Sequence, residues 1–384
     1  MAFDFDRIYN RLGTDSNKWH RFAPDVLPMF VADMDFRSPD VVIEALHARV
    51  EHGFFGYARE PDELFEVASQ RIADRFGWHV APEAIVAVPG VVGGVNLATQ
   101  TFASPGDAVV LQTPAYPPIL HCPEKYGMAP RLARLVQDES GRYTPDWDEF
   151  DAAITGAGLF LLCNPHNPVG RAFEPVELRR MADGCVRNGA LMVSDEIHCD
   201  LVMPGYRHTP IASLSPEIEA RTVTFMAPSK TFNLPGLKTS IAVIPNPELR
   251  ERFVAARADL LRTPNLLGIA AAVAAYRDGG AWLDELLRYL QSNRDYVTSF
   301  VHDRLPGVRV YPAEATYLAW LDCRGAAITG TEPCEFFLEH AKVGLSDGAT
   351  FGEDGRGFVR LNFACPRAML EDGLSRMERS LAAL

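Results

Sequence analysis

The feature of this sequence that most constrains its fold is a series of short, mostly apolar runs with helical patterns between them. The runs occupy residues 85–88, 108–111, 131–135, 158–163, 190–194, 222–226 and 240–244. Short runs of this kind are typical of strands buried on both faces, as parallel strands are. Because helices between parallel strands form right-handed crossovers, the pattern predicts an α/β fold around a largely parallel sheet.

The order of elements changes near residue 306, which indicates a second domain. Strands are expected at 308–311, 317–321 and 358–363, and helices at 333–342 and 366–381, outside the strand–helix–strand order. The segment 344–357 is rich in Gly and Asp and is expected to be a mobile loop. We predict an N-terminal arm over 1–45 that packs on the small domain, a large domain over 46–285, and a smaller C-terminal α/β domain over 286–384.

The composition restricts the class of protein. Of the 384 residues, 47% are hydrophobic and 23% charged, as in globular proteins. The net charge of -13 argues against nucleic acid or an anionic membrane as a partner, because both would repel the chain. No apolar run approaches the roughly 18 residues of a membrane span, and no signal-peptide pattern is visible. The seven cysteines include no CxxC pair and are expected to be reduced thiols in a cytoplasmic protein.

Lys230 follows the apolar run 222–226, in a polar turn that begins at Ser229. Burying an ammonium without a partner is costly, so packing gives no reason for a lysine at this point. An amine held in a partly dry pocket is the nucleophile that forms a Schiff base with a carbonyl compound, above all pyridoxal phosphate. A solvated loop lysine is the alternative that the turn by itself leaves open.

Two further apolar runs end in polar residues. The run 158–163 is followed by a stiff loop with two Asn-Pro pairs, which includes Asn167, at the strand end where ligands sit in open α/β sheets. The run 190–194 leads to Asp195, whose carboxylate requires a cationic or N–H partner. His198 follows three residues later, either as a core histidine or as part of a site.

The glycine-rich segment 89–94 follows the run 85–88, and a helix is expected from 95 to about 102. Glycines between a strand and a helix let the backbone approach a ligand, and a helix N-terminus attracts phosphate. The spacing differs from Walker and dinucleotide motifs, so an anion site is only one interpretation. Tyr116 lies in a rigid, proline-rich turn that presents its aromatic ring. Tyr57 lies in a glycine-flanked loop, where it either contacts a ligand or serves packing.

Charged residues at two other places also have two interpretations. Arg360 lies in the apolar run 358–363, where a guanidinium pairs with a carboxylate of the protein or with one of a substrate. Asp33 and Asp35 share one face of an extended segment. Because no third ligand is nearby, we expect structural hydrogen bonds from them rather than a metal site.

Four motifs, in this order along the chain, together resemble one family. They are Asn164-Pro-His-Asn-Pro-Val-Gly170, Ser194-Asp-Glu-Ile-His198, Ala227-Pro-Ser-Lys-Thr-Phe-Asn233 and Arg360-Leu-Asn-Phe-Ala-Cys-Pro-Arg367. The set is similar to fold-type I pyridoxal-phosphate enzymes of the class I/II aminotransferase superfamily. Val31-Ala-Asp-Met-Asp-Phe36 and Lys18-Trp19 resemble the cystathionine β-lyase branch, the MalY/PatB-like carbon–sulfur lyases. The resemblance covers nearly the whole chain and implies a three-layer α/β/α large domain with a smaller α/β domain.

The resemblance implies pyridoxal 5'-phosphate as the cofactor and assigns the residues around its ring. Lys230 would hold the cofactor covalently and then move the substrate's Cα proton. Asp195 would pair with the pyridine nitrogen, and Asn167 would hydrogen-bond the ring O3′ with support from His198. Tyr116 would stack on the ring, and it would contact the amino-acid substrate together with Asn167.

The phosphate and the substrate carboxylate are assigned in the same way. Phosphate would lie on the N–H groups of Val91 and Val92 and on the Ser229 hydroxyl. Tyr57 would reach the phosphate of a neighbouring subunit, which implies a homodimer with shared active sites. Arg360 would bind the substrate α-carboxylate.

Three residues depart from the pattern of the family. Ala227 stands where many aminotransferases have a phosphate-binding serine, and Lys238 stands where many have an arginine. We expect Lys238 to replace part of these contacts. Phe30 stands where the branch usually has tryptophan, so the shape of the substrate pocket is not set by the resemblance.

The activity that the resemblance implies is β-elimination on L-cystathionine or a related L-cysteine S-conjugate, which yields a thiol, pyruvate and ammonia. An aminotransferase is the first alternative, because it uses the same residues. A non-catalytic regulatory protein on the same scaffold is the second.

Overall fold

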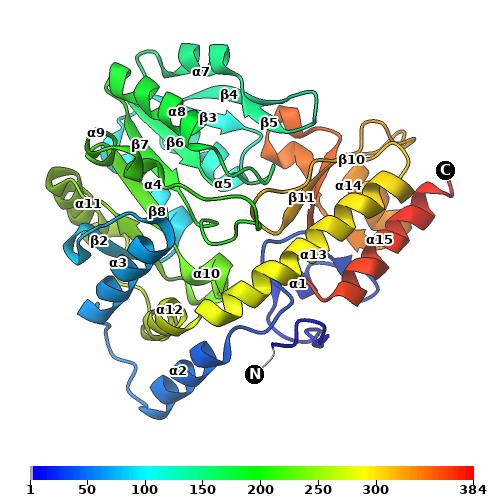
Figure 1. Cartoon of the computed structure of the whole chain (residues 1–384), viewed down its shortest axis with the longest axis horizontal. Coiled ribbons are helices and arrows are strands. Elements are labelled where there is room, and N and C mark those ends of the chain that lie inside the picture. The colour runs from blue at the N-terminus through cyan, green and yellow to red at the C-terminus, as the bar shows by residue number, and fades with distance from the viewer. Residues whose placement is uncertain (1–2) are drawn as a thin grey trace.

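An eight-stranded sheet is the centre of the larger lobe in the computed structural model, which describes residues 3–384 (Figure 1). Its strand order is β2-β9-β8-β7-β6-β3-β4-β5. The strands are β2 (Ile85–Val88), β3 (Ala108–Thr113), β4 (Ala129–Gln137), β5 (Tyr143–Pro145), β6 (Leu159–Cys163), β7 (Leu191–Asp195), β8 (Thr222–Met226) and β9 (Ser240–Val243). The strands from β8 to β4 are parallel to one another, and β9 and β5 run antiparallel to the other six strands. The predicted largely parallel sheet is therefore confirmed.

Helices cover both faces of this sheet, because successive residues of a strand point to opposite sides. In β6, Leu159 and Leu161 face the apolar cluster formed with α4 and α11, whereas Phe160 and Leu162 face the cluster formed with α7 and α8. This is the three-layer α/β/α arrangement that the resemblance implied. The long helices of this lobe are α2 (Asp40–Glu51), α3 (Asp62–Phe76), α4 (Val91–Phe102), α7 (Trp147–Ile154), α8 (Pro175–Asn188), α11 (Pro247–Leu260) and α12 (Leu266–Asp278). Short helices are α5 (Pro117–Leu120), α6 (Cys122–Lys125), α9 (Pro216–Glu219) and α10 (Pro228–Thr231).

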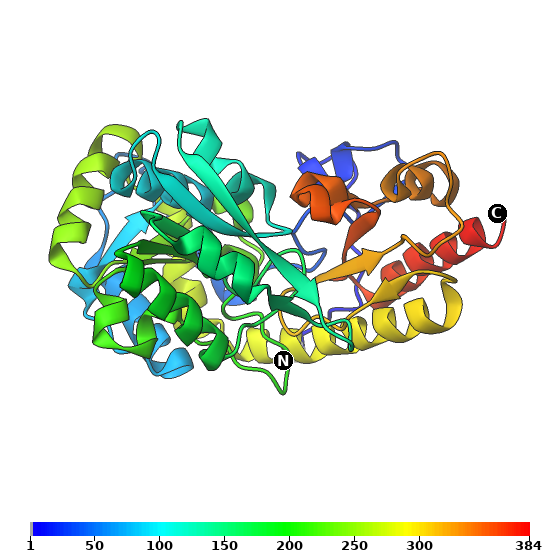
Figure 2. The same cartoon turned by 90° about the horizontal axis from the view of Figure 1, so that it is seen from above.

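The smaller lobe contains a four-stranded antiparallel sheet in the order β10-β11-β14-β13 (Figure 2). Its strands are β10 (Arg309–Val310), β11 (Leu318–Asp322), β13 (Ser346–Asp347) and β14 (Phe358–Asn362), with α14 (Pro333–Phe336) and α15 (Arg367–Leu381) beside them. The segment expected as the loop 344–357 contains β13 and two short 3₁₀ helices, Gly348–Phe351 and Glu353–Gly355. Phe351 is buried against Trp320, so this segment is folded and packed rather than a free loop.

Helix α13 (Gly280–Arg304) runs from one lobe into the other (Figure 2). The predicted boundary between residues 285 and 286 falls inside it, and the division into domains stays a prediction. The N-terminal segment lies on the smaller lobe, where β1 (Leu27–Pro28) pairs with β12 (Val343–Gly344) and α1 (Asn17–His20) precedes it. Within residues 3–384, no helix combines the length and apolar character that crossing a membrane requires.

The predicted start of the helix after β2 is wrong by four residues. Helix α4 begins at Val91 rather than at residue 95, so Gly93 and Gly94 are helical and not part of a loop. A Cβ atom on Gly94 would come within 2.4 Å of the Phe225 ring, so this glycine allows close packing of helix on sheet. Gly90, at φ 101°, makes the turn that starts the helix.

Candidate active site

A cavity of about 480 Å³ contains every predicted site residue except Tyr57. The predicted residues that line it are Val91, Val92, Tyr116, Asn167, Asp195, His198, Ser229, Lys230, Lys238 and Arg360. The parallel strands β6, β7 and β8 are adjacent in the sheet, so the residues that follow them meet at one edge. Residues that are far apart in sequence are therefore gathered by the strand order.

Lys230 is partly buried, and its Nζ donates a hydrogen bond of 2.5 Å to the Ala32 carbonyl oxygen. Burial and, to a smaller extent, the nearby Arg360 lower the pKa of Lys230 to about 8, against the opposing effects of Asp33 and Asp195. A lysine with this pKa exists partly as the neutral amine near pH 7, so the structure favours a nucleophile over a solvated loop lysine.

Asp195 ends β7 and is 3% exposed, and its Oδ1 accepts the N–H of Ile197 at 3.0 Å. Burial raises the pKa of Asp195 to about 6, against the opposing effects of the Ile197 N–H and of Lys230, and no residue among 3–384 forms an ion pair with it. A protonated ring nitrogen entering the cavity would supply the missing partner.

His198 is 2% exposed, and no hydrogen-bond partner within the described chain satisfies its Nδ1. Burial, together with Lys230 and Arg360, lowers the pKa of His198 well below its ordinary value, so the ring is neutral. Because its imidazole lines the cavity with an unsatisfied nitrogen, the core-histidine interpretation does not account for it.

Arg360 is 5% exposed and forms no ion pair with a carboxylate among residues 3–384. Its Nη1 donates to Asn167 Oδ1 at 2.9 Å, and its Nη2 donates to the Phe30 carbonyl and to Ser346 Oγ at 3.0 and 3.2 Å. Its Nε has no partner there, and burial lowers the pKa of Arg360 to about 10. A buried guanidinium held only by neutral acceptors is suited to an anionic ligand, so the internal ion pair is not the arrangement found.

The first turn of α4 supplies the anion end of the cavity. The N–H groups of Val91 and Val92 have no partners within the helix, as at any helix start, and both residues line the cavity. Ser229 is 8% exposed and Lys238 is exposed, and both line the same cavity. Ala227 instead packs into the apolar cluster beneath α4.

Tyr57 is fully exposed and does not line the cavity of its own chain. Phe54 and Phe55 beside it are also exposed, by 74% and 59%. The ring of Phe30 packs on Phe22, with centroids 5.3 Å apart, while its carbonyl bonds to the arginine of the site.

Asp35 is buried and accepts hydrogen bonds from Lys18, Arg11 and Trp19 at 2.6, 2.8 and 2.9 Å. Asp33 pairs with the same two cations. The expected structural hydrogen bonding is confirmed, and it fixes residues 29–36, here named the strap. The carbonyls of Phe30 and Ala32 in the strap are the ones that bond to the site.

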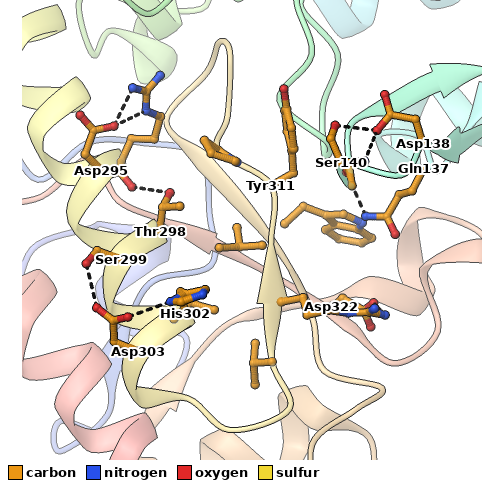
Figure 3. Close-up of a pocket in the computed structure, with 18 of the residues that line it drawn as sticks. Gln137, Asp138, Ser140, Asp295, Thr298, Ser299, His302, Asp303, Tyr311 and Asp322 are labelled. Atoms are coloured by element: carbon orange, nitrogen blue, oxygen red, sulfur yellow. Dashed lines mark hydrogen bonds and ion pairs between the residues drawn. The ribbon is translucent and has the colours of Figure 1, made fainter.

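A larger cavity, of about 860 Å³, lies between α13 and the β4–β5 turn (Figure 3). None of the predicted site residues lines it. Asp303 accepts from Ser299 and pairs with His302, and Asp138 accepts from Ser140. The carboxylates of Asp303 and Asp138 in this cavity therefore already accept hydrogen bonds from neighbouring side chains.

Three residues that contact the site were not predicted. The Ala32 carbonyl accepts a hydrogen bond from Lys230 and another from the Tyr317 hydroxyl, and Ser346 Oγ accepts one from Arg360. A backbone carbonyl carries no signal in the sequence. Ser346 lies in the segment expected to be a loop, and Tyr317 was expected only as the first residue of a strand.

Known proteins resemble this chain in sequence and in fold. The sequence model of the family "Aminotransferase class I and II" matches residues 25–377. "Cystathionine beta-lyase PatB" of Bacillus subtilis is 40% identical over 99% of this chain and 100% of its own. The crystal structure of OvoB is 43% identical, with a TM-score of 0.94 and full coverage of both chains. The PLP-bound putative aminotransferase from Clostridium difficile 630 is 33% identical, with a TM-score of 0.97 over 99% of this chain and 100% of that one.

Proposed function

The chain belongs to the class I and II aminotransferase family, and we propose that it is a pyridoxal-phosphate-dependent carbon–sulfur lyase. Its substrate would be L-cystathionine or a related L-cysteine S-conjugate. The observation that carries the proposal is one cavity that holds a lysine of lowered pKa, a carboxylate without a cation and a guanidinium without an anion. The name of the B. subtilis relative, at 40% identity over the full length, supports a lyase.

The unsatisfied groups fit pyridoxal phosphate. Asp195 would hold the ring nitrogen, and the free N–H groups of Val91 and Val92 with the Ser229 hydroxyl would hold the phosphate. We expect Lys238 to add a positive charge for that phosphate. When bound, the cofactor supplies an aldehyde for amines and a ring that withdraws electrons from the substrate.

The ring would also be held from its sides. Asn167, bonded to Arg360, would donate its amide N–H to the ring O3′ with His198 as support. Tyr116 is partly buried in the cavity, and we expect its aromatic face to stack on the ring.

The substrate steps fall to two residues. Arg360 would bind the α-carboxylate through its free Nε–H and one Nη–H, which orients the Cα–H bond. Lys230 Nζ, as the neutral amine, would accept the Cα proton and later deliver it to the departing sulfur. The Cβ–S bond breaks, the thiol leaves, and water completes the formation of pyruvate and ammonia.

An aminotransferase remains the second candidate function, since the C. difficile structure carries that name and the site residues serve both reactions. A non-catalytic regulatory protein is disfavoured by the intact set of Lys230, Asp195 and Arg360. Tyr57 and the exposed Phe54 and Phe55 support a homodimer in which Tyr57 reaches the partner's phosphate. A cytoplasmic location stays a prediction from the sequence.

The test is to incubate the purified protein and pyridoxal phosphate with L-cystathionine, without any 2-oxo acid, and to measure thiol and pyruvate. Equal amounts of both are expected. Strict dependence of product formation on an added 2-oxo acid would show an aminotransferase. A protein that gives no product with or without an oxo acid, over a panel of cysteine conjugates, would favour the regulatory alternative.

A further inference from the structure

We propose that Tyr317 is a positioning residue for Lys230. Its hydroxyl shares the Ala32 carbonyl oxygen with the Lys230 ammonium and so weakens the hydrogen bond that holds the lysine there. The inference rests on the proposed function, because it concerns the lysine that would take up the cofactor. No motif of the sequence points to Tyr317, and the residue does not line the cavity itself.

The geometry places two donors on one acceptor. The Ala32 carbonyl oxygen accepts Lys230 Nζ at 2.5 Å and the Tyr317 hydroxyl at 2.9 Å. Tyr317 is 1% exposed, so its hydroxyl is shielded from bulk solvent. Its ring also meets His198 edge to face, with centroids 6.0 Å apart, and is thereby fixed from the cavity side.

The backbone at Thr316, directly before Tyr317, is strained, so the surrounding structure must hold this segment in an unfavourable conformation. Thr316 has φ 71°, a left-handed conformation that a β-branched residue rarely adopts. Its N–H donates to the Leu201 carbonyl at 2.7 Å, and its hydroxyl accepts the N–H of Leu318. Strain of this kind persists where the surroundings fix it, and here it presents the Tyr317 hydroxyl to the strap.

The consequence for Lys230 follows from the sharing of the acceptor. An oxygen that already accepts a hydroxyl proton is a poorer acceptor for an ammonium, so the charged form of the lysine gains less from it. Arg360 faces Lys230 as a further positive charge, Asp33 and Asp195 face it as carboxylates, and His198 is neutral. Removing the Tyr317 hydroxyl leaves these charges in place and strengthens the hold of Ala32 on the ammonium.

The step that reports this effect is the capture of pyridoxal phosphate. The ammonium first loses a proton to solvent, and the nitrogen lone pair then attacks the aldehyde carbon. Water leaves as the carbon–nitrogen double bond forms. Only the neutral amine can attack, so the capture rate follows the fraction of Lys230 that is neutral and free of Ala32.

The experiment compares cofactor-free wild-type protein with Tyr317→Phe between pH 6.5 and 10. Capture is followed by the change in cofactor absorption, with Lys230→Ala as the blank for other lysines. We expect Tyr317→Phe to capture the cofactor about fivefold more slowly at pH 7, the size of one ordinary hydrogen bond, and at the wild-type rate near pH 10. The midpoint of its rate–pH curve should therefore lie above that of the wild type.

Tyr143→Phe is the matched control, because it removes a buried hydroxyl that accepts from Trp320 and does not reach the cavity. Its capture rate should equal the wild-type rate at every pH. A Tyr317→Phe curve that coincides with the wild type, or that is lowered equally at all pH values as a structural defect would cause, overturns the proposal. If the wild-type protein itself captures no cofactor, the proposed function fails instead.

Discussion

The two cavities of this chain differ in how their polar groups are paired. In the larger one, the carboxylates of Asp138 and Asp303 are satisfied by neighbouring side chains. In the smaller one, Arg360 Nε and His198 Nδ1 have no partner within the described residues, and the Asp195 carboxylate forms no ion pair there. Unsatisfied polar atoms cost free energy to bury, so their concentration in one place marks a ligand site better than volume does.

The origin of each cavity explains the difference. The smaller cavity lies where parallel strands end beside the N-terminus of α4, so backbone and side-chain groups converge there without elements to pair them. The larger cavity lies between α13 and a surface turn (Figure 3), where Asp303 and Asp138 bond to neighbours close by in sequence and Arg309 pairs with Asp322 of the adjacent strand. Substitutions in the two cavities should therefore differ widely in effect.

The largest effect is expected from Lys230→Ala. Without the amine, neither cofactor capture nor removal of the Cα proton is possible, so turnover should fall by about 1,000-fold or more. Thiol release from a cysteine conjugate and cofactor absorption measure it. Activity within tenfold of the wild type would show that Lys230 is not the catalytic group of the smaller cavity.

Arg360→Lys should have an intermediate effect. A lysine keeps the positive charge but cannot offer two parallel N–H groups to a carboxylate, so KM should rise by roughly 30-fold with a smaller change in kcat. Arg309→Lys is the matched control in the larger cavity, where the arginine pairs with Asp322. An unchanged KM in Arg360→Lys would place the substrate carboxylate elsewhere.

The smallest effect is expected from Ser299→Ala in the larger cavity. It removes one exposed hydrogen bond to Asp303, so turnover and KM should stay within about twofold and the free energy of unfolding within about 0.5 kcal/mol. Steady-state kinetics and denaturant titration measure both. A large loss of activity with unchanged stability would show that the larger cavity takes part in the reaction, and would erase the contrast between the two.

The fold could be predicted where the sequence pattern is local. Apolar runs such as 222–226 became strands with the expected bounds. The start of α4 was misplaced, because Gly93 and Gly94 look like a loop until the close approach of Phe225 is known. That approach is a tertiary contact that no local pattern contains.

The site could be predicted where side chains carry the chemistry. Lys230, Asp195 and Arg360 each follow or occupy an apolar strand, and the cavity brings them together. The contribution of Ala32 could not be predicted, because any residue has a carbonyl and only the packing of the strap turns this one towards the lysine. The same holds for Tyr317, which acts through that carbonyl.

The anchoring of the strap has a practical consequence for anyone who shortens or fuses this protein. None of Arg11, Lys18 and Trp19 lines the cavity, yet the two cations and the indole N–H hold the acid at position 35. Deleting the first twenty residues would leave the buried Asp35 without these partners. It would also loosen the strap, whose Ala32 carbonyl accepts the hydrogen bond from Lys230. Such a deletion would therefore be expected to disturb the candidate active site as well as the terminus.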